Sequence, residues 1–376
     1  MDETTLKKVK ESISSDLDWE YIIKNGAEHG ILPLLHLNLS KLDKECGISE
    51  KVLDYLRKQY NVNVAKNLTY YEELGKVLRV FKDEGIGTIV LKGAALAETV
   101  YGDIGLRPFS DVDLLIKKEN LPEAKKILTD MGYKLDEEVS PEKYNEEYGC
   151  DLYFAGKRNI IEIHWDILRK LGSDRFMRID IRDIWERARP ASISGVDTLI
   201  MSPEDQLLHL CIHLPKHRYN RLIWLCDILE VVRHYDIEWD QIIRSSEVYK
   251  TKAHMYYGLQ FSDEMLGPEV PPEVLRKLRP NPLERMMVRP VLKDVLSEDR
   301  RIMPIFNLMK LLLIDRHSDR MRYLWIYIFP PVESLKRKYS VSGSIVYFYY
   351  VLHPIYVLSK TARRLLAIIR FNKTKS

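Results

Sequence analysis

The stretch GTIVLKGAALAETVYGDIGLRPFSDVDLLIKKEN, residues 87–120, decides the expected fold. It starts with a short apolar run that is typical of a buried strand, and a helical pattern follows at Gly93. A second apolar run, DVDLLI, contains Asp111 and Asp113, one residue apart. Because side chains alternate along a strand, both carboxylates are expected on the same face. Such a pair repels unless a cation lies between the two groups.

A magnesium site explains this pair of acids. Mg²⁺ prefers oxygen ligands, often one or two carboxylates completed by substrate phosphates and water. Further along, DLYFA and IIEIHW are joined by the turn-prone GKRN and predict a hairpin, in which Glu162 and His164 share one face. On a neighbouring strand, Glu162 would supply a third carboxylate and let two metal ions share the site. We therefore predict Asp111, Asp113 and Glu162 as metal ligands and catalytic residues.

The turn between the first strand and the helix predicts the phosphate side of the same site. Gly93 has no Cβ, so a phosphate can approach the backbone N–H groups at the start of the helix. Lys92 and Arg107 lie nearby in the sequence and offer positive charge. Acids, glycine and cations together describe a site for a nucleoside triphosphate.

The periodicity on either side of this core predicts an α+β fold, a small mixed sheet flanked by helical regions. In the second helical region, Ser202 and Pro203 have the residue types of an N-cap and a first helical position. The expected boundaries are an N-terminal helical region at 1–84, the core at 85–170, a helical domain at 171–300 and a basic aromatic extension at 301–376.

A set of motifs carries a resemblance to a known family. Gly93, the Asp-x-Asp of Asp111 and Asp113, and the later strand acid resemble the polymerase-β-type nucleotidyltransferase superfamily. More narrowly, LKGAAL, YGDIGLRPFSDVDLLI, IEIHWDI, SPEDQLLHLCIH and LIWLCDILEVV, taken in this order, resemble the family of uncharacterised nucleotidyltransferases. The resemblance runs from about Asn25 to Ile243.

The resemblance implies a nucleotidyltransferase core and an enzyme that moves an NMP group from an NTP to an acceptor oxygen with two Mg²⁺ ions. It places the nucleotide against Lys92, Gly93, Ala94, Arg107 and Ser110. Many members of the wider superfamily have Gly-Ser where this chain has Gly93-Ala94, so a hydroxyl contact to phosphate is missing here.

The acceptor has no signature in the sequence. A small molecule or biosynthetic intermediate is favoured over nucleic acid, because no RNA-binding module is recognisable. Two alternatives stay open, a non-catalytic nucleotide sensor or scaffold and an RNA nucleotidyltransferase. The role of Glu162 as metal ligand, general base or both is also open.

Three further residues are candidates for contact with substrate or for positioning the site. His164 shares a face with Glu162, although a histidine hydrogen-bonded within the strand is the commoner case. Asp227 lies in an apolar helical run and needs a partner, which we expect to be His213, with substrate recognition as the alternative. His209, His213 and His217 recur every four residues, but their apolar companions favour helix packing over zinc binding.

Composition limits the class of protein. The 376 residues are 45% hydrophobic and 30% charged, as in a soluble globular protein. The cysteines form no CxxC pair, which argues against a zinc ribbon, and the N-terminus lacks the apolar core of a signal peptide. We therefore expect a cytoplasmic protein.

The C-terminal segment has a different composition. From Arg316 to Ser376 there are 12 Lys or Arg and 2 Asp or Glu, and the run VSGSIVYFYYVLHPIYVL is strongly aromatic. One interpretation is a basic helical subdomain that packs its aromatic residues against the body. The other is peripheral contact with an anionic membrane through residues 336–370. In that interpretation, the Tyr and Phe side chains lie at the level of the lipid headgroups.

Overall fold

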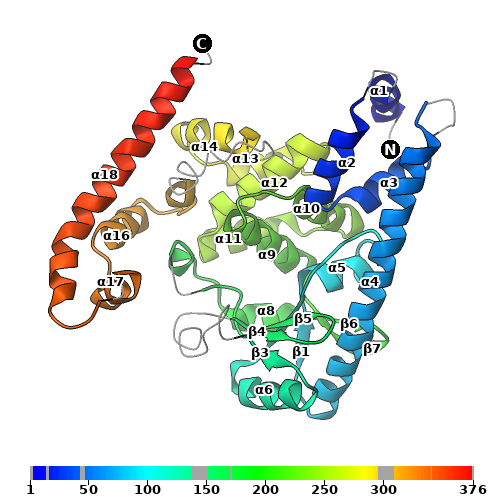
Figure 1. Ribbon diagram of the computed structural model, residues 1–376, viewed down its shortest axis with the longest axis horizontal. Helices are drawn as coiled ribbons and strands as arrows, with labels where there is room; N and C mark the ends of the chain where they lie inside the picture. The colour runs from blue at the N-terminus through cyan, green and yellow to red at the C-terminus, as the bar shows by residue number, and fades with distance from the viewer. Residues whose placement is uncertain are drawn as a thin grey trace.

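The computed structural model describes residues 3–13, 17–42, 47–136, 151–169, 172–294, 309–339 and 341–374. The predicted α+β fold is confirmed (Figure 1). Before and within the sheet region, the helices are α1 (Glu3–Ile13), α2 (Trp19–Glu28), α3 (Leu32–Leu39), α4 (Glu50–Asp83), α5 (Lys92–Thr99), α6 (Leu121–Asp130) and α8 (Ile181–Arg187). After the sheet follow α9 (Pro203–Lys216), α10 (Leu222–His234), α11 (Trp239–Tyr249), α12 (Lys252–Leu266), α13 (Pro272–Leu278), α14 (Pro282–Asp294), α16 (His317–Ile328), α17 (Val332–Tyr339) and α18 (Ile345–Thr374).

One mixed sheet forms the centre of the molecule. In the described part of the chain it has seven strands in the order β3-β4-β5-β2-β1-β7-β6. Strand β2 pairs antiparallel with β1 and parallel with β5, which sets Asp113 directly beside Glu162. The strands are β1 (Thr88–Val90), β2 (Val112–Ile116), β3 (Lys134–Leu135), β4 (Asp151–Ala155), β5 (Ile160–His164), β6 (Arg189–Ile193) and β7 (Val196–Ile200).

The two faces of the sheet pack against different helices. On one face, Leu114, Ile116 and Ile163 join a core with Leu78 of α4 and Leu128 of α6. On the other face, Ile89 and Leu115 join the larger core of the helices after the sheet, α9 to α13. Asp113 and Glu162 alternate with the residues of the first core, so they face α9.

Helix α9 begins as the sequence predicts. The Ser202 side chain accepts a hydrogen bond from the Asp205 backbone N–H, and Pro203 takes the first helical position. This cap fixes where the helix starts above the sheet. His209 therefore lies on the buried part of the helix, two turns further on.

The sheet extends past residue 170. The hairpin of β6 and β7 adds two strands, with Ser194 and Gly195 at the turn in left-handed conformations (φ +53° and +70°). The predicted domain boundaries stay a prediction, and the boundary between 300 and 301 lies outside the described residues. Two of the four cysteines, Cys46 and Cys150, also lie outside the described residues.

Helices α16 to α18 form a separate layer at the left edge of the molecule in Figure 1. Helix α18 packs on α16 and α17. Over the residues that the structure describes, none of the helices combines the length and the apolar character needed to span a membrane.

Candidate active site

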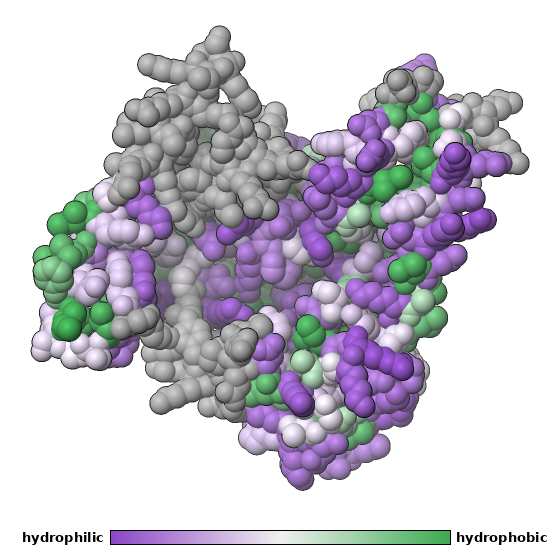
Figure 2. Space-filling view, in the orientation of Figure 1, coloured by the Kyte–Doolittle hydropathy of each residue, from purple (hydrophilic) through white to green (hydrophobic). Residues whose placement is uncertain are grey.

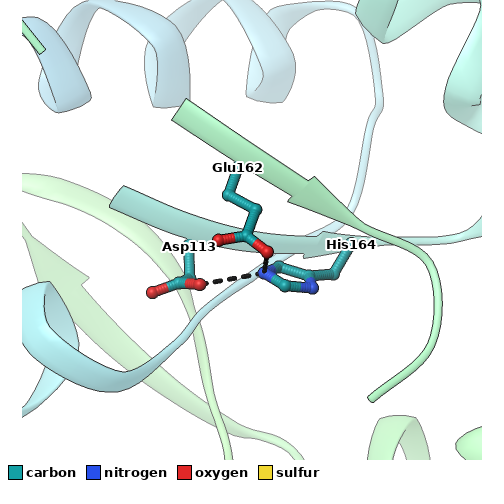
Figure 3. A group of neighbouring side chains, drawn as sticks. All are labelled: Asp113, Glu162 and His164. Carbon is teal, nitrogen blue, oxygen red and sulfur yellow. Dashed lines mark hydrogen bonds and ion pairs between the residues drawn. The ribbon is translucent and has the colours of Figure 1, made fainter. Parts of the chain in front are cut away.

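Three buried side chains converge on the face of the sheet that is turned to α9. The Nε2 atom of His164 lies 2.9 Å from an oxygen of Asp113 and 3.3 Å from an oxygen of Glu162. Figure 3 shows both carboxylates directed at the same imidazole nitrogen from adjacent strands, β2 and β5. Potential ligand atoms of the three residues all lie within 4.8 Å of one another. The predicted pair Asp113 and Glu162 is thus brought together, and His164 joins them.

The two carboxylates of this group differ in proton affinity. Burial raises the pKa of Glu162 to about 7, and the neighbouring charge of Asp113 adds to the effect against the opposing influence of His164 and Lys92. Burial acts in the same direction on Asp113, yet the Lys92 ammonium and His164 outweigh it and hold the pKa well below the usual range. Asp113 is therefore a permanent anion, whereas Glu162 can exchange a proton near neutral pH.

Asp111 lines the same cavity as Asp113, Glu162 and His164. It precedes β2, is less buried than Asp113, and accepts a hydrogen bond from the Ser110 hydroxyl at 3.1 Å. Its pKa is raised by burial and by the charge of Asp113. Asp111 and Ser110 both line the cavity described below. Their predicted roles as metal ligand and nucleotide contact fit this position and stay predictions.

Lys92 is the residue with the unusual backbone at this site. Its φ of +45° lies in the left-handed region, which non-glycine residues seldom adopt. Its ammonium group lies 2.8 Å from an oxygen of Asp113, and its side chain is 15% exposed. Gly93 instead allows close packing, since an added Cβ would come within 2.6 Å of Arg107 and 2.7 Å of Phe109. Lys92 thus balances the charge of Asp113 directly.

Asp227 pairs with Arg107. The expectation that it pairs with His213 is wrong. Arg107 donates from Nη2 to one oxygen of Asp227 at 2.6 Å and from Nε to the other at 3.2 Å, and the Tyr101 hydroxyl donates at 3.0 Å. Asp227 is completely buried. The guanidinium and carboxylate are 120 residues apart in the chain, so no local pattern could reveal the pair. A phosphate contact by Arg107 stays a prediction.

Asp113, Glu162 and His164 line a cavity of about 760 Å³. Its far wall is formed by α9, α10 and α16, which contribute His213, Trp224 and Tyr323. The rings of His213 and His217 lie 4.4 Å apart, and each is about 5 Å from the Trp224 ring, at 5.3 and 5.0 Å. Burial lowers the pKa of both histidines, to about 4 for His217. The far wall is therefore an aromatic surface opposite the acids.

Some positioning residues were missed in the sequence. Tyr153 faces Glu162 across the β4–β5 pair and hydrogen-bonds to it. Asn67, on the long helix α4, donates to the backbone oxygens of Ile104 and Arg107 at 2.5 and 3.0 Å and so holds the loop before β2. The regular polar and aromatic pattern of these segments gave no signal of either contact. Ala94 lies in the core, where its carbonyl accepts a hydrogen bond from a buried tyrosine hydroxyl.

The donor set fits a divalent cation. Two buried carboxylates, Asp113 and Glu162, lie beside each other with Asp111 one residue before β2. Burying such acids together is costly unless positive charge is shared between them. The Lys92 ammonium supplies part of that charge here, and the His164 ring hydrogen-bonds to Asp113. Carboxylate oxygens that converge at the wall of a cavity are the ligands that Mg²⁺ takes in nucleotide sites.

A comparison with known protein families gives the assignment. Residues 15–267, which include every strand of the sheet and the acid group, match the family described as uncharacterised nucleotidyltransferases. The chain belongs to that family. The match covers more than half of the sequence and agrees with the expected range, so this protein is a nucleotidyltransferase. The comparison with curated proteins found no match.

Solved structures resemble parts of this nucleotidyltransferase. One is ANT(2")-Ia in complex with adenylyl-2"-tobramycin, at 12% identity and a TM-score of 0.36, covering 49% of this chain and 98% of that one. Another is the lincomycin-bound lincosamide antibiotic adenylyltransferase LnuA, at 16% identity and a TM-score of 0.27, covering 36% and 83%. A third is an antigenic nucleotidyltransferase-like protein from Paracoccidioides brasiliensis, at 12% identity and a TM-score of 0.31, covering 59% and 92%. The assignment rests on the family match and not on these likenesses.

Proposed function

We propose that this nucleotidyltransferase moves an NMP group from an NTP to an oxygen of a small molecule or biosynthetic intermediate, with Mg²⁺. The observation that carries the proposal is the convergence of Asp113, Glu162 and His164 within 4.8 Å on the wall of a cavity of about 760 Å³. A cavity of this size is in the range that holds a small organic ligand. Asp111 completes the acidic group.

In the proposed reaction, an acceptor oxygen attacks the α-phosphorus of the NTP. A new P–O bond forms, the bond from the α-phosphorus to the bridging oxygen breaks, and pyrophosphate leaves. Mg²⁺ held by Asp111, Asp113 and Glu162 would supply the positive charge that such phosphoryl transfer requires. No covalent enzyme intermediate is needed, because positioning and charge provide most of the catalysis.

The protein side chains take separate roles in this proposal. Asp113, with its lowered pKa, stays anionic throughout and anchors the acidic group. Glu162 would hold Mg²⁺, accept the proton of the acceptor hydroxyl, or do both, and the Tyr153 hydroxyl hydrogen-bonds to it. Lys92 and Gly93 line the cavity, where the Lys92 ammonium and the Gly93 backbone N–H would bind phosphate oxygens.

The aromatic wall is the proposed place of the base or the acceptor. His213, His217 and Trp224 present flat, uncharged rings to the cavity, since the pKa values of both histidines are lowered by burial. Such rings stack on planar or apolar groups. Lys216 and Arg221 add positive charge at the same wall.

The test is a transfer assay on the full chain. Each of the four NTPs, labelled at the α-phosphate, is incubated with Mg²⁺ and either a metabolite extract or total RNA, with a chelator control. We expect label in a small product and release of pyrophosphate, both lost with the chelator. Label in RNA alone would replace the small acceptor with nucleic acid. NTP binding without any transfer would overturn the proposal in favour of a sensor.

A further inference from the structure

Helix α18 carries an exposed apolar face. Residues spaced three or four apart along it are between 60% and 68% exposed, namely Ile345, Phe348, Val351, Ile355 and Leu358. This spacing sets them along one side of a helix, and we call this set the α18 apolar face. Large contiguous apolar surfaces on soluble proteins mark sites of interaction with a protein or a membrane.

The opposite side of the helix fixes this orientation. Val346, His353 and Val357 are buried, and the His353 ring bonds through Nδ1 to the hydroxyl of Tyr339 on α17 at 2.8 Å. The stacked rings of Tyr339 and Tyr349 lie 4.6 Å apart and add to the same contact. Helix α18 therefore turns its apolar side outward because its other side is already packed.

Helix α16 extends the exposed surface with aromatic and flexible apolar side chains. Met321 is 65% exposed and Trp325 is 64% exposed. Figure 2 shows apolar residues gathered at the outer left edge, over the region of α16 to α18 in Figure 1. The interpretation in which the aromatic residues of VSGSIVYFYYVLHPIYVL pack against the body does not hold for Tyr347 and Phe348, which are both 65% exposed.

The charged residues of this C-terminal region are mostly basic. Lys338 and Lys360 lie 5.3 and 5.4 Å from the centre of the ring of Tyr356, a residue of α18 that is 42% exposed. From Arg316 to Ser376 the chain has 12 Lys or Arg and only 2 Asp or Glu. Two copies of so basic a segment repel each other, whereas an anionic surface attracts it.

We propose that the α18 apolar face, with Trp325, docks on the surface of an anionic phospholipid membrane. The apolar side chains would enter the boundary between headgroups and acyl chains, Trp and Tyr would lie at the headgroup level, and Lys338 and Lys360 would contact lipid phosphates. The amphipathic rings of Trp and Tyr favour this interface. A membrane satisfies both the apolar and the basic character of the surface.

The docking surface is joined to the active-site cavity through α16. Tyr323 lines the cavity and its ring stacks on Tyr327 at 6.3 Å, while Trp325, between them in sequence, points to the exterior. Membrane contact would therefore hold the cavity near the lipid surface.

Co-sedimentation with vesicles tests the proposal without using activity. The full chain is mixed with vesicles of phosphatidylcholine alone or of phosphatidylcholine with phosphatidylserine, at low and high salt. We expect pelleting with the anionic vesicles and release at high salt. Equal pelleting with both kinds of vesicle, or none with either, would overturn the proposal.

Matched variants locate the surface. Phe348→Gln with Ile355→Gln is expected to weaken binding to anionic vesicles by about tenfold or more, because two apolar side chains no longer enter the lipid. The control is Leu68→Gln with Val248→Gln, at positions 55% and 64% exposed on other helices, which should bind like the parent. Binding by the first variant equal to the parent would refute the assignment. So would a parent that forms dimers, ignores vesicles and becomes monomeric in the first variant, because a second copy would then cover the face.

Discussion

Two buried carboxylates of this nucleotidyltransferase, Asp113 and Asp227, differ in how their negative charge is balanced. Asp227 faces one guanidinium in a two-pronged ion pair and receives a tyrosine hydroxyl as well. Around Asp113, three carboxylates lie close to one lysine and one imidazole. The Lys92 ammonium contacts Asp113, the His164 ring contacts Glu162, and the charges of Asp113 and Lys92 both act on Asp111. The first cluster is balanced, whereas the second has more acids than fixed cations. We take this difference to separate a structural pair from a site that binds a cation.

The surroundings of the two clusters follow the same division. Asp227 is fully buried on α10, whereas Asp113 and Glu162 line the cavity. Lys92, the cation at the second cluster, also has a left-handed backbone, which is typical of functional positions held in place by their surroundings. Charge, access and strain thus coincide at Asp113 and not at Asp227.

The largest expected effect is on catalysis at Asp113. Asp113→Asn keeps the volume but removes the negative charge, so we expect the rate of NMP transfer to fall by about 10⁴-fold, or about 5.5 kcal/mol of barrier. The control is Asp197→Asn, an exposed aspartate whose side chain is 86% accessible. Transfer by Asp113→Asn at the rate of the control would place the chemistry elsewhere.

The next effect is on stability at Arg107. Arg107→Met leaves the charge of Asp227 buried without its guanidinium, which should lower the free energy of unfolding by about 3–5 kcal/mol in urea titrations. Adding Asp227→Leu removes the stranded charge and should restore much of the loss. An unchanged free energy of unfolding combined with weaker NTP binding would instead assign Arg107 to the phosphates.

Lys92 is the third position to test, because it both neutralises Asp113 and lines the cavity. Lys92→Met should weaken NTP binding by about 1.5–3 kcal/mol, the scale of a lost charge-assisted hydrogen bond, measured by nucleotide titration. Lys82→Met is the control, because the Lys82 side chain is 54% exposed and its ammonium pairs with Asp197 on the surface. Equal affinities in the two variants would leave Lys92 as a counter-ion of Asp113 only.

The smallest effect is the pH dependence of stability near the aromatic wall. Burial lowers the pKa of His209 well below its usual value, so the folded protein stays unprotonated there while the unfolded chain binds a proton below about pH 6.5. Stability is therefore lost as the pH falls from 6.5 toward the folded pKa, by about 1.4 kcal/mol per pH unit.

His209→Gln should reduce this slope, measured by urea titrations between about pH 7.5 and 5.5. His317→Gln, at an exposed position, is the control for replacing a histidine with glutamine. Identical slopes in the parent and in His209→Gln would mean that His209 titrates alike in both states.

The sequence was sufficient for the core and for the acids, because their signals are local. Alternation along DVDLLI and IIEIH set Asp113, Glu162 and His164 on predictable faces, and the hairpin joining β4 and β5 followed from its turn. Strand neighbours then brought the three side chains together. The hairpin of β6 and β7 carried a comparable signal, an alternating run around Ser194-Gly195, but it lies in a segment expected to be helical.

The contacts that could not be predicted are long-range. Arg107 and Asp227 meet only because α10 packs near the loop before β2, and Asn67 reaches that loop from a helix with no chemical pattern. Exposure of the aromatic residues in α18 depends on which side α16 and α17 cover, which periodicity alone does not determine. Tertiary packing decides each of these outcomes.

Direct measurement of divalent cation binding tests the central claim most closely. Mn²⁺, as a paramagnetic substitute for Mg²⁺, is titrated into the protein with a non-hydrolysable NTP analogue and followed by electron paramagnetic resonance. We predict saturable binding to the parent and to Arg107→Met with Asp227→Leu, and its loss in Asp113→Asn. Binding to Asp113→Asn as tight as to the parent would contradict the account.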